Sequence, residues 1–282
     1  MKLLGRTQWR NSIGTALIGA ILFLLIVWGQ HILLDTLKNK WVEECFHLLR
    51  NGVLLYIALG LFVAIGAGTA LHHRLYGFKD KRPRGPGDDV PWWGWGERLV
   101  HWSCVAAFVL LLVTGVQLYF AGAGLPDATT RLMRSWHFNE AFALTGMVLF
   151  LLWFGKALPR RYDFEWLRHW GGYLGYRGHL RAGKFNAGQK IWFWVFTVSG
   201  ILMVLTGYQL QHHFSRLDPE YYTVLVLHLG AATGFLAFMG IHLYFSVIAV
   251  KGALSGMIRG RIGLRGARHL HSEALPPDTG HI

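Results

Sequence analysis

The sequence predicts an all-α membrane protein in which a four-helix transmembrane bundle follows two extra N-terminal transmembrane helices. Three observations support this fold class. Of the 282 residues, 53% are hydrophobic and only 15% are charged, whereas a soluble domain carries about 25% charged residues. Six apolar runs approach or exceed the roughly 20 residues that cross a bilayer. Lysine and arginine are concentrated in alternate connections between these runs.

The first two predicted helices, 12–34 and 52–73, contain no Asp, Glu, Lys or Arg. Basic residues precede the first helix, as in a secretory signal peptide, but no pair of small residues marks a cleavage site near its end. We therefore expect this helix to be retained. The proline-rich linker that follows the second helix ends with Trp92, Trp93 and Trp95. We expect these tryptophans to lie at the lipid headgroups.

The four later helices are expected over 99–120, 136–156, 191–212 and 223–249. Three of them are free of charged residues. The remaining apolar run, 141–155, reaches bilayer length only by including Glu140, which we place near the membrane interface. The sequence thus divides into an N-terminal extension (1–97), a four-helix core (98–262) and a tail (263–282).

The connections indicate the orientation of the chain. With the N-terminus in the cytoplasm, the inside segments hold 22 of the 28 Lys and Arg residues. This bias predicts a multi-pass protein with both termini cytoplasmic. It also accounts for the net charge of +13 without a nucleic-acid partner, because short basic loops face anionic membrane lipid. The two cysteines exclude a disulfide framework and a paired-cysteine metal motif.

Four of the fifteen histidines fall inside or at the entrance of predicted helices of the core. His228 and His242 lie 14 residues apart on one helix, which places them on the same face and about 21 Å apart along the axis. One therefore lies near the outer side and the other near the inner side of a membrane core about 30 Å thick. His101 enters its helix from the inner side, and His137 enters its helix from the outer side.

Depth pairs His137 with His228 and His101 with His242. Two pairs of histidines at two depths are what two stacked b haems require, because neutral imidazole is a good axial ligand of haem iron. Polar groups inside a membrane are costly, so four at matched depths indicate function. Arg98 is placed to contact a propionate of the inner haem. Alternatively, Arg98 is one of the basic residues that anchor the chain at the inner membrane interface, a role that does not involve a haem.

A polar stretch, Phe185–Lys190, precedes the helix 191–212 on the inner side. Asn186 is placed to cap this helix. The Asn186 and Gln189 side chains, together with the free N–H groups of a helix start, are also suited to bind a quinone carbonyl. The predicted depth of this stretch in the membrane matches that of the inner haem, which favours a quinone site at this stretch.

These residues resemble a known family. The segments are Arg98–Trp102, Phe185–Lys190, the pair His228 and His242, and Met257–Arg261. They look like the gamma subunit of membrane-bound respiratory formate dehydrogenase, a di-haem cytochrome b. The resemblance covers roughly 95–262. It implies that His101 and His242 bind the cytoplasmic-side haem, that His137 and His228 bind the periplasmic-side haem, and that Asn186, Gly188 and Gln189 lie beside the menaquinone site.

The resemblance also implies a place in a respiratory chain of the bacterial inner membrane. An iron–sulfur beta subunit would receive electrons from a molybdenum- or tungsten-containing alpha subunit that oxidises formate. Electrons would then cross two b haems to menaquinone or ubiquinone, so that the chain acts as one subunit of a formate:quinone oxidoreductase. Two alternatives stay open. One is a cytochrome b subunit of a hydrogenase or a thiosulfate or other oxyanion reductase, and the other is a haem-free membrane anchor or transporter.

Overall fold

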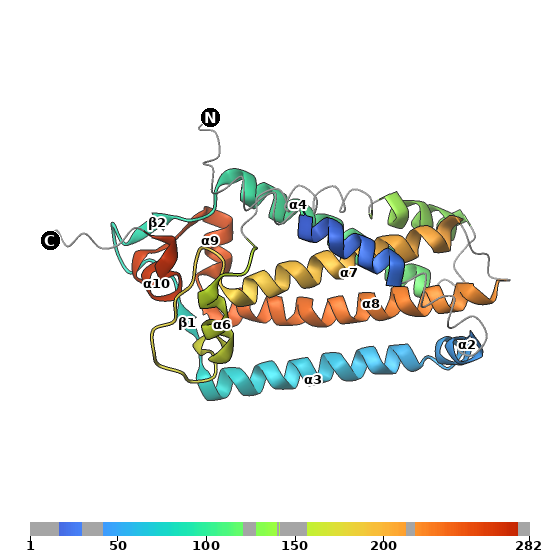
Figure 1. Ribbon diagram of the computed structural model, residues 1–282, viewed down its shortest axis with the longest axis horizontal. Coiled ribbons are helices and arrows are strands. Elements are labelled where there is room, and N and C mark those ends of the chain that lie inside the picture. Colours follow the sequence, from blue (N-terminus) through green and yellow to red (C-terminus); the bar gives the residue numbers. More distant parts are fainter. Residues whose placement is uncertain are drawn as a thin grey trace. The chain divides into compact units, whose positions relative to one another are not determined.

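The computed structural model of this chain describes residues 17–29, 42–120, 128–139, 141, 157–212 and 218–275 (Figure 1). Four helical segments in this part are long and apolar enough to cross a membrane. They are α3 (Val53–Tyr76), α4 (Trp95–Phe120), α7 (Ala187–His212) and a segment, Glu220–Ala249, that joins α8 (Pro219–Leu243) to the π-helix η3 (Tyr244–Ala249). These helices confirm the predicted spans at 52–73, 99–120, 191–212 and 223–249.

Helices α4 and α7 each begin four residues before the predicted start, and capping explains both differences. Glu97 accepts a hydrogen bond from the Gly94 N–H group at 2.8 Å, near the start of α4. Asn186 and Gln189 bond to each other's backbone at the start of α7. Polar caps satisfy N–H groups that have no partner within the helix, so each helix extends beyond its apolar run.

The other two predicted spans lie largely outside the described residues. Of 12–34, the structure describes a helix over Leu17–Gly29, and of 136–156 it describes only the end of a helix over 128–139 together with residue 141. A nine-residue helix, α2 (Val42–Arg50), precedes α3. The described residues therefore establish one membrane-length helix, α3, in the N-terminal extension.

The apolar helices expose side chains that water would disfavour. In α3 the most apolar 18-residue window has a mean hydropathy of 2.2, and none of it is buried within the protein. Tyr56 and Val63 are more than two-thirds exposed. Such an extended apolar surface needs a lipid environment, because soluble proteins rarely expose patches of this size.

The chain forms two compact units. The first comprises 1–58, 99–155 and 196–235, and the second comprises 59–98, 156–195 and 236–282. Each long helix contributes one part to each unit. The division into 1–97, 98–262 and 263–282 stays a prediction.

In the second unit, two short sheets join the linker to the C-terminal segment. Strand β1 (Lys79–Asp80) pairs in parallel with β3 (Val250–Lys251), and β2 (Asp89–Pro91) pairs antiparallel with β4 (Arg261–Gly263). Short helical segments complete this unit: α6 (Arg161–Arg168), η2 (Trp170–Gly172), α9 (Ala253–Arg259), α10 (Leu264–Leu270) and η4 (Ser272–Ala274).

A small protein core holds the linker in place. Trp92 is only 7% exposed and packs with Ile262 and Ala267. The expectation that Trp92 lies at the headgroups is therefore wrong, because the C-terminal segment offers a closer apolar surface. Trp95 is 72% exposed, as an interfacial anchor would be.

A buried pair of basic side chains also joins the linker to the C-terminal segment. Lys81 Nζ donates to His271 Nε2 at 2.5 Å, and His271 Nδ1 donates to the Gly183 carbonyl oxygen at 2.8 Å. Burial, followed by the charge of Lys79, lowers the pKa of Lys81 to about 8. Burial, followed by the charge of Lys81, lowers the pKa of His271 to about 3. His271 is therefore a neutral acceptor at pH 7.

Candidate functional site

The four predicted haem ligands lie on three helical segments. His101 is on α4, His137 is on the helix over 128–139, and His228 and His242 are on α8. All four rings are partly buried. His101, His137 and His228 belong to the first unit, and His242 belongs to the second.

Within the first unit, the rings of His137 and His228 lie close together in a T-shaped arrangement. Their ring centroids are 6.2 Å apart, and their planes differ by 65°. The Nδ1 atom of each ring lies 2.9 Å from a threonine hydroxyl, that of Thr114 for His137 and that of Thr206 for His228. Two histidines far apart in the sequence are thus brought together with matching partners.

The spacing of this pair fits a metal ion between the rings. Two imidazoles on opposite sides of one ion, with nitrogen–metal distances of about 2 Å, have ring centroids about 6 Å apart. Both rings also lie against glycines. A Cβ atom on Gly115 would be 3.2 Å from His137 Cε1, and one on Gly207 would be 3.5 Å from His228 Cε1. The residues present therefore fit a haem iron held by His137 and His228.

The other two histidines have distinct surroundings. His101 Nδ1 is buried and has no hydrogen-bond partner among the described residues, which leaves the donor capacity of this nitrogen unused. In the second unit, the Trp192 indole stacks on His242 with a centroid distance of 4.8 Å and an interplanar angle of 13°. The pairing of His101 with His242 stays a prediction.

Arg98 has a partner within the second unit. Its Nη1 atom donates to the Ile258 carbonyl oxygen at 2.6 Å, near the end of α9. A Cβ atom on Gly260 would lie 3.3 Å from Arg98 Nε, so the absence of a side chain there admits the guanidinium. Arg98 Nε itself is buried without a partner in the described part of the chain. The guanidinium therefore caps the C-terminal end of α9, and the contact of Arg98 with a haem propionate stays a prediction.

Asn186 and Gln189 form a reciprocal cap at the start of α7. Asn186 Oδ1 accepts the Gln189 N–H at 2.9 Å, and Gln189 Oε1 accepts the Asn186 N–H at 3.0 Å. Each side-chain oxygen is thus engaged with the backbone, and each NH₂ group is the remaining donor. Gly188 lies under an aromatic ring, since a Cβ atom there would be 2.9 Å from the Trp166 ring.

Sequence reasoning missed a buried ion pair next to this cap. Lys190 Nζ lies 2.6 Å from Asp163 Oδ2, and both side chains are less than a tenth exposed. Asp163 Oδ1 is buried and has no partner among the described residues. The only signal was that Asp163 and Glu165 are the two acidic residues of a segment, 156–190, with eight lysines and arginines.

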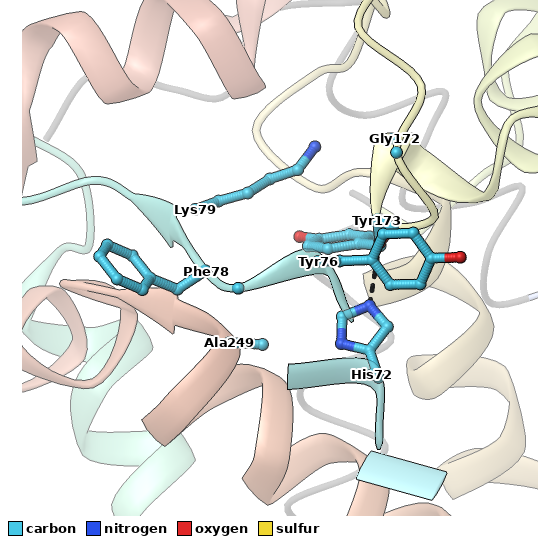
Figure 2. A pocket seen from close by; sticks show the side chains of 9 residues that line it. His72, Tyr76, Phe78, Lys79, Gly172, Tyr173 and Ala249 are labelled. Carbon is cyan, nitrogen blue, oxygen red and sulfur yellow. Dashed lines mark hydrogen bonds between the residues drawn. The ribbon is translucent and has the colours of Figure 1, made fainter. Parts of the chain in front are cut away.

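A small pocket of about 70 Å³ lies at the end of α3 (Figure 2). His72 Nε2 donates to the Tyr173 carbonyl oxygen at 2.9 Å, so its Nδ1 accepts from the Tyr244 hydroxyl at 2.5 Å. Lys79 Nζ donates to the Gly171 carbonyl oxygen and lies 4.6 Å above the Tyr173 ring. Burial lowers the pKa of Lys79 and raises that of Tyr173. The residues expected to bind haem or quinone do not line this pocket.

Helices of membrane length and a close pair of histidines fit an integral membrane cytochrome b. A comparison with known families supports this class, because the family of prokaryotic cytochrome b561 matches residues 92–260. The match covers more than half of the chain, and the chain belongs to this family. The matched region begins in the linker and includes all four predicted haem-ligating histidines.

Curated relatives extend the comparison. The chain is 29% identical over 193 residues to the formate dehydrogenase cytochrome b556 subunit of Haemophilus influenzae, covering 62% of this chain and 77% of the relative. It is 28% identical over 185 residues to the nitrate-inducible formate dehydrogenase cytochrome b556(Fdn) subunit of Escherichia coli, covering 62% and 85%. The cytochrome b556(fdo) subunit of the same species is 23% identical. The resemblance to formate dehydrogenase gamma subunits is confirmed.

Proposed function

We propose that this chain is the membrane cytochrome b subunit of a respiratory formate dehydrogenase and that it passes electrons to quinone. The observation that carries this proposal is the 6.2 Å spacing of the His137 and His228 rings. The similarity to formate dehydrogenase cytochrome b556 subunits supports formate as the source of electrons. The chain serves as one subunit of a formate:quinone oxidoreductase.

The proposed cofactors are two b haems, whose iron exchanges single electrons when the haems are bound. His137 and His228 hold one on the periplasmic side, and His101 and His242 hold the other on the cytoplasmic side. The remaining task of the chain is to fix the orientation and basicity of these imidazoles. Arg98 is assigned to a propionate of the cytoplasmic-side haem through its unpaired Nε atom.

The proposed quinone site lies at the start of α7. The NH₂ groups of Asn186 and Gln189 donate to a carbonyl of menaquinone or ubiquinone, because their oxygens already serve the helix cap. Gly188 leaves room for the Trp166 ring, which lies beside this proposed site. Each quinone reduced to quinol takes two electrons and two protons, and the protons come from the cytoplasm.

The proposed assembly is a complex in the bacterial inner membrane with both termini of this chain in the cytoplasm. An iron–sulfur beta subunit delivers electrons from a molybdenum- or tungsten-containing alpha subunit in the periplasm. Membrane lipid covers the exposed apolar surfaces of the long helices. The basic segments face lipid headgroups and not nucleic acid.

The test is a haem count and a choice of electron donor. The chain would be purified from membranes in its complex, and its haem would be counted as pyridine haemochrome. Two b haems per chain, reduced by formate and reoxidised by a quinone analogue, are the expected result. Reduction of the haems by hydrogen, or their oxidation by thiosulfate, would instead assign the chain to a hydrogenase or an oxyanion reductase. A chain without haem would overturn the proposal in favour of an anchor or transporter.

A further inference from the structure

A short repeat occurs in two of the long helices. Helix α4 contains Thr-Gly-Val-Gln-Leu at 114–118, and α7 contains Thr-Gly-Tyr-Gln-Leu at 206–210. Each threonine contacts a histidine on the next helix of the chain, 23 residues later for Thr114 and 22 residues later for Thr206. The same sequence thus meets the same type of side chain twice.

The two threonine–histidine contacts have equal geometry. Each joins Oγ1 to Nδ1 at 2.9 Å, and both threonines are at most 3% exposed. Each hydroxyl also lies 2.7 Å from the carbonyl oxygen four residues earlier, Leu110 for Thr114 and Leu202 for Thr206. The equality holds although the two histidines lie on different helices.

These distances determine which nitrogen carries the proton. A carbonyl oxygen only accepts, so the single hydroxyl hydrogen of each threonine is used on its own helix. The threonine oxygen must then accept a hydrogen bond from Nδ1–H of the histidine. A neutral imidazole with its hydrogen on Nδ1 has its lone pair on Nε2, which is the state that binds a metal through Nε2.

The glycine after each threonine completes the arrangement. A Cβ atom at Gly115 or Gly207 would lie 3.2 Å or 3.5 Å from the Cε1 atom of the same ring that the preceding threonine bonds. The Thr-Gly pair therefore supplies one polar contact and one open position for each imidazole. We name these two pairs, Thr114–Gly115 and Thr206–Gly207, the histidine seats.

We propose that Thr114 and Thr206 are positioning residues that fix His137 and His228 in the metal-binding tautomer and tune one haem from both sides. The inference rests on the proposed function, since it assumes that this histidine pair holds a haem. A hydrogen bond from Nδ1–H raises the basicity of the imidazole, as outer partners of metal-bound histidines do. A more basic ligand stabilises ferric iron, so both threonines hold the reduction potential of this haem low.

The experiment uses the purified complex, four variants at Thr114 and Thr206, and one control variant. Thr114→Val and Thr206→Val remove the hydroxyl oxygen that accepts the hydrogen bond from histidine, with little change in side-chain shape. Thr114→Ser and Thr206→Ser retain this hydroxyl. Thr69→Val is the matched control, because Thr69 on α3 bonds the carbonyl oxygen four residues earlier at 2.8 Å and has no histidine partner among its described hydrogen bonds. Potentiometric titration followed by optical and EPR spectra reports each haem separately.

Both valine variants should raise the midpoint potential of the same haem and shift the same low-spin ferric signal. The other haem should keep its wild-type values, and the serine and Thr69 variants should match the wild type. Unchanged potentials and signals in both valine variants, or shifts on different haems, would overturn the assignment. If a valine variant does not accumulate in membranes, the alanine variant is compared with serine in the same way.

The two levels of the proposal fail differently. A wild-type complex without haem in this chain overturns both the proposed function and the role of the threonines. A wild-type complex with two haems whose valine variants behave as wild type overturns the positioning role alone.

Discussion

Lys190 and Asp163 form an ion pair with a nitrogen–oxygen distance of 2.6 Å and side-chain exposures of 8% and 6%. Lys190 is the fourth residue of α7, and Asp163 is the third residue of α6. The pair therefore joins the start of α7 to a helix that precedes it by some twenty residues. It lies directly after the cap formed by Asn186 and Gln189.

Removing one member of this pair should destabilise the second unit. Lys190→Met leaves a buried carboxylate without its cation, which costs about 3 to 5 kcal/mol. Arg181→Met is the control, because its ion pair with Glu273 is 59% and 34% exposed and is worth less than about 1 kcal/mol. Thermal unfolding in detergent measures both. Adding Asp163→Asn to Lys190→Met should recover part of the loss, and a double variant no better than the single one would argue against coupling.

In the proposed quinone site, the side-chain oxygen of Asn186 caps α7 and its NH₂ group donates to the quinone, so the two roles can be tested separately. Asn186→Asp keeps an oxygen for the helix cap and removes the NH₂ group, so stability should hold while quinone binding weakens. Loss of one hydrogen bond of about 1 kcal/mol predicts a rise of roughly fivefold to tenfold in KM for a quinone analogue. Steady-state kinetics with a soluble quinone measures this. Asn186→Ala should lower both stability and affinity, and an unchanged KM in both variants would remove Asn186 from the site.

Single substitutions of the four histidines should remove haems in pairs. His137→Ala and His228→Ala should abolish the same spectral component, because each removes one ligand of a shared iron. His101→Ala and His242→Ala should abolish the other component. Reduced-minus-oxidised spectra of membranes, with the haem count per chain, measure these losses. An identical loss from His101→Ala and His228→Ala would contradict the pairing by depth.

The contact between Lys81 and His271 should make the C-terminal segment sensitive to acid. The pKa of His271 falls from 6.5 to about 3 on docking, so the undocked state binds a proton at a higher pH than the docked state. Docking is strongest above pH 6.5 and weakens as pH falls toward 3, by up to about 2 kcal/mol at pH 5. Hydrogen exchange over 261–275, corrected for its intrinsic pH dependence, measures this.

A variant without the titrating ring provides the comparison. His271→Gln retains an acceptor for Lys81 and does not titrate, so its exchange should depend on pH less than that of the wild type between pH 5 and 7. His269→Gln removes a neighbouring histidine whose pKa is also lowered, by burial and then by the charges of Lys79 and His179, and it should reduce the response less than His271→Gln does. Equal pH responses in His271→Gln and the wild type would assign the effect to another group.

The membrane helices were predictable because their signal is local. A run without charge that is long enough to cross the bilayer determines an element by itself, and α3, α4, α7 and α8 agree with such runs. Helix starts were less accurate, because side-chain caps such as Glu97 extend the helix past its apolar run. Trp92 was misplaced because its partner Ile262 lies far along the chain, and no local pattern reveals such a contact.

The candidate site was only partly readable. The histidines stood out because polar groups are rare in apolar runs. Thr114 and Thr206 did not, since a hydroxyl bonded to its own helix is common in membrane segments. The repeated Thr-Gly-x-Gln-Leu sequence was visible, but its meaning depends on the distances to His137 and His228. The contact between Lys81 and His271 joins residues 190 positions apart and could not be inferred from sequence.

The pairing of β1 with β3 and of β2 with β4 places a constraint on the biosynthesis of the chain. The linker strands leave the ribosome well before their partners, which lie about 170 residues further on. At 5 to 20 residues per second this delay is about 10 to 30 seconds. Both short sheets and the small core around Trp92 therefore form only after the helices between them have been synthesised. Ribosome-bound chains that end before residue 250 should accordingly have a linker that protease can cleave.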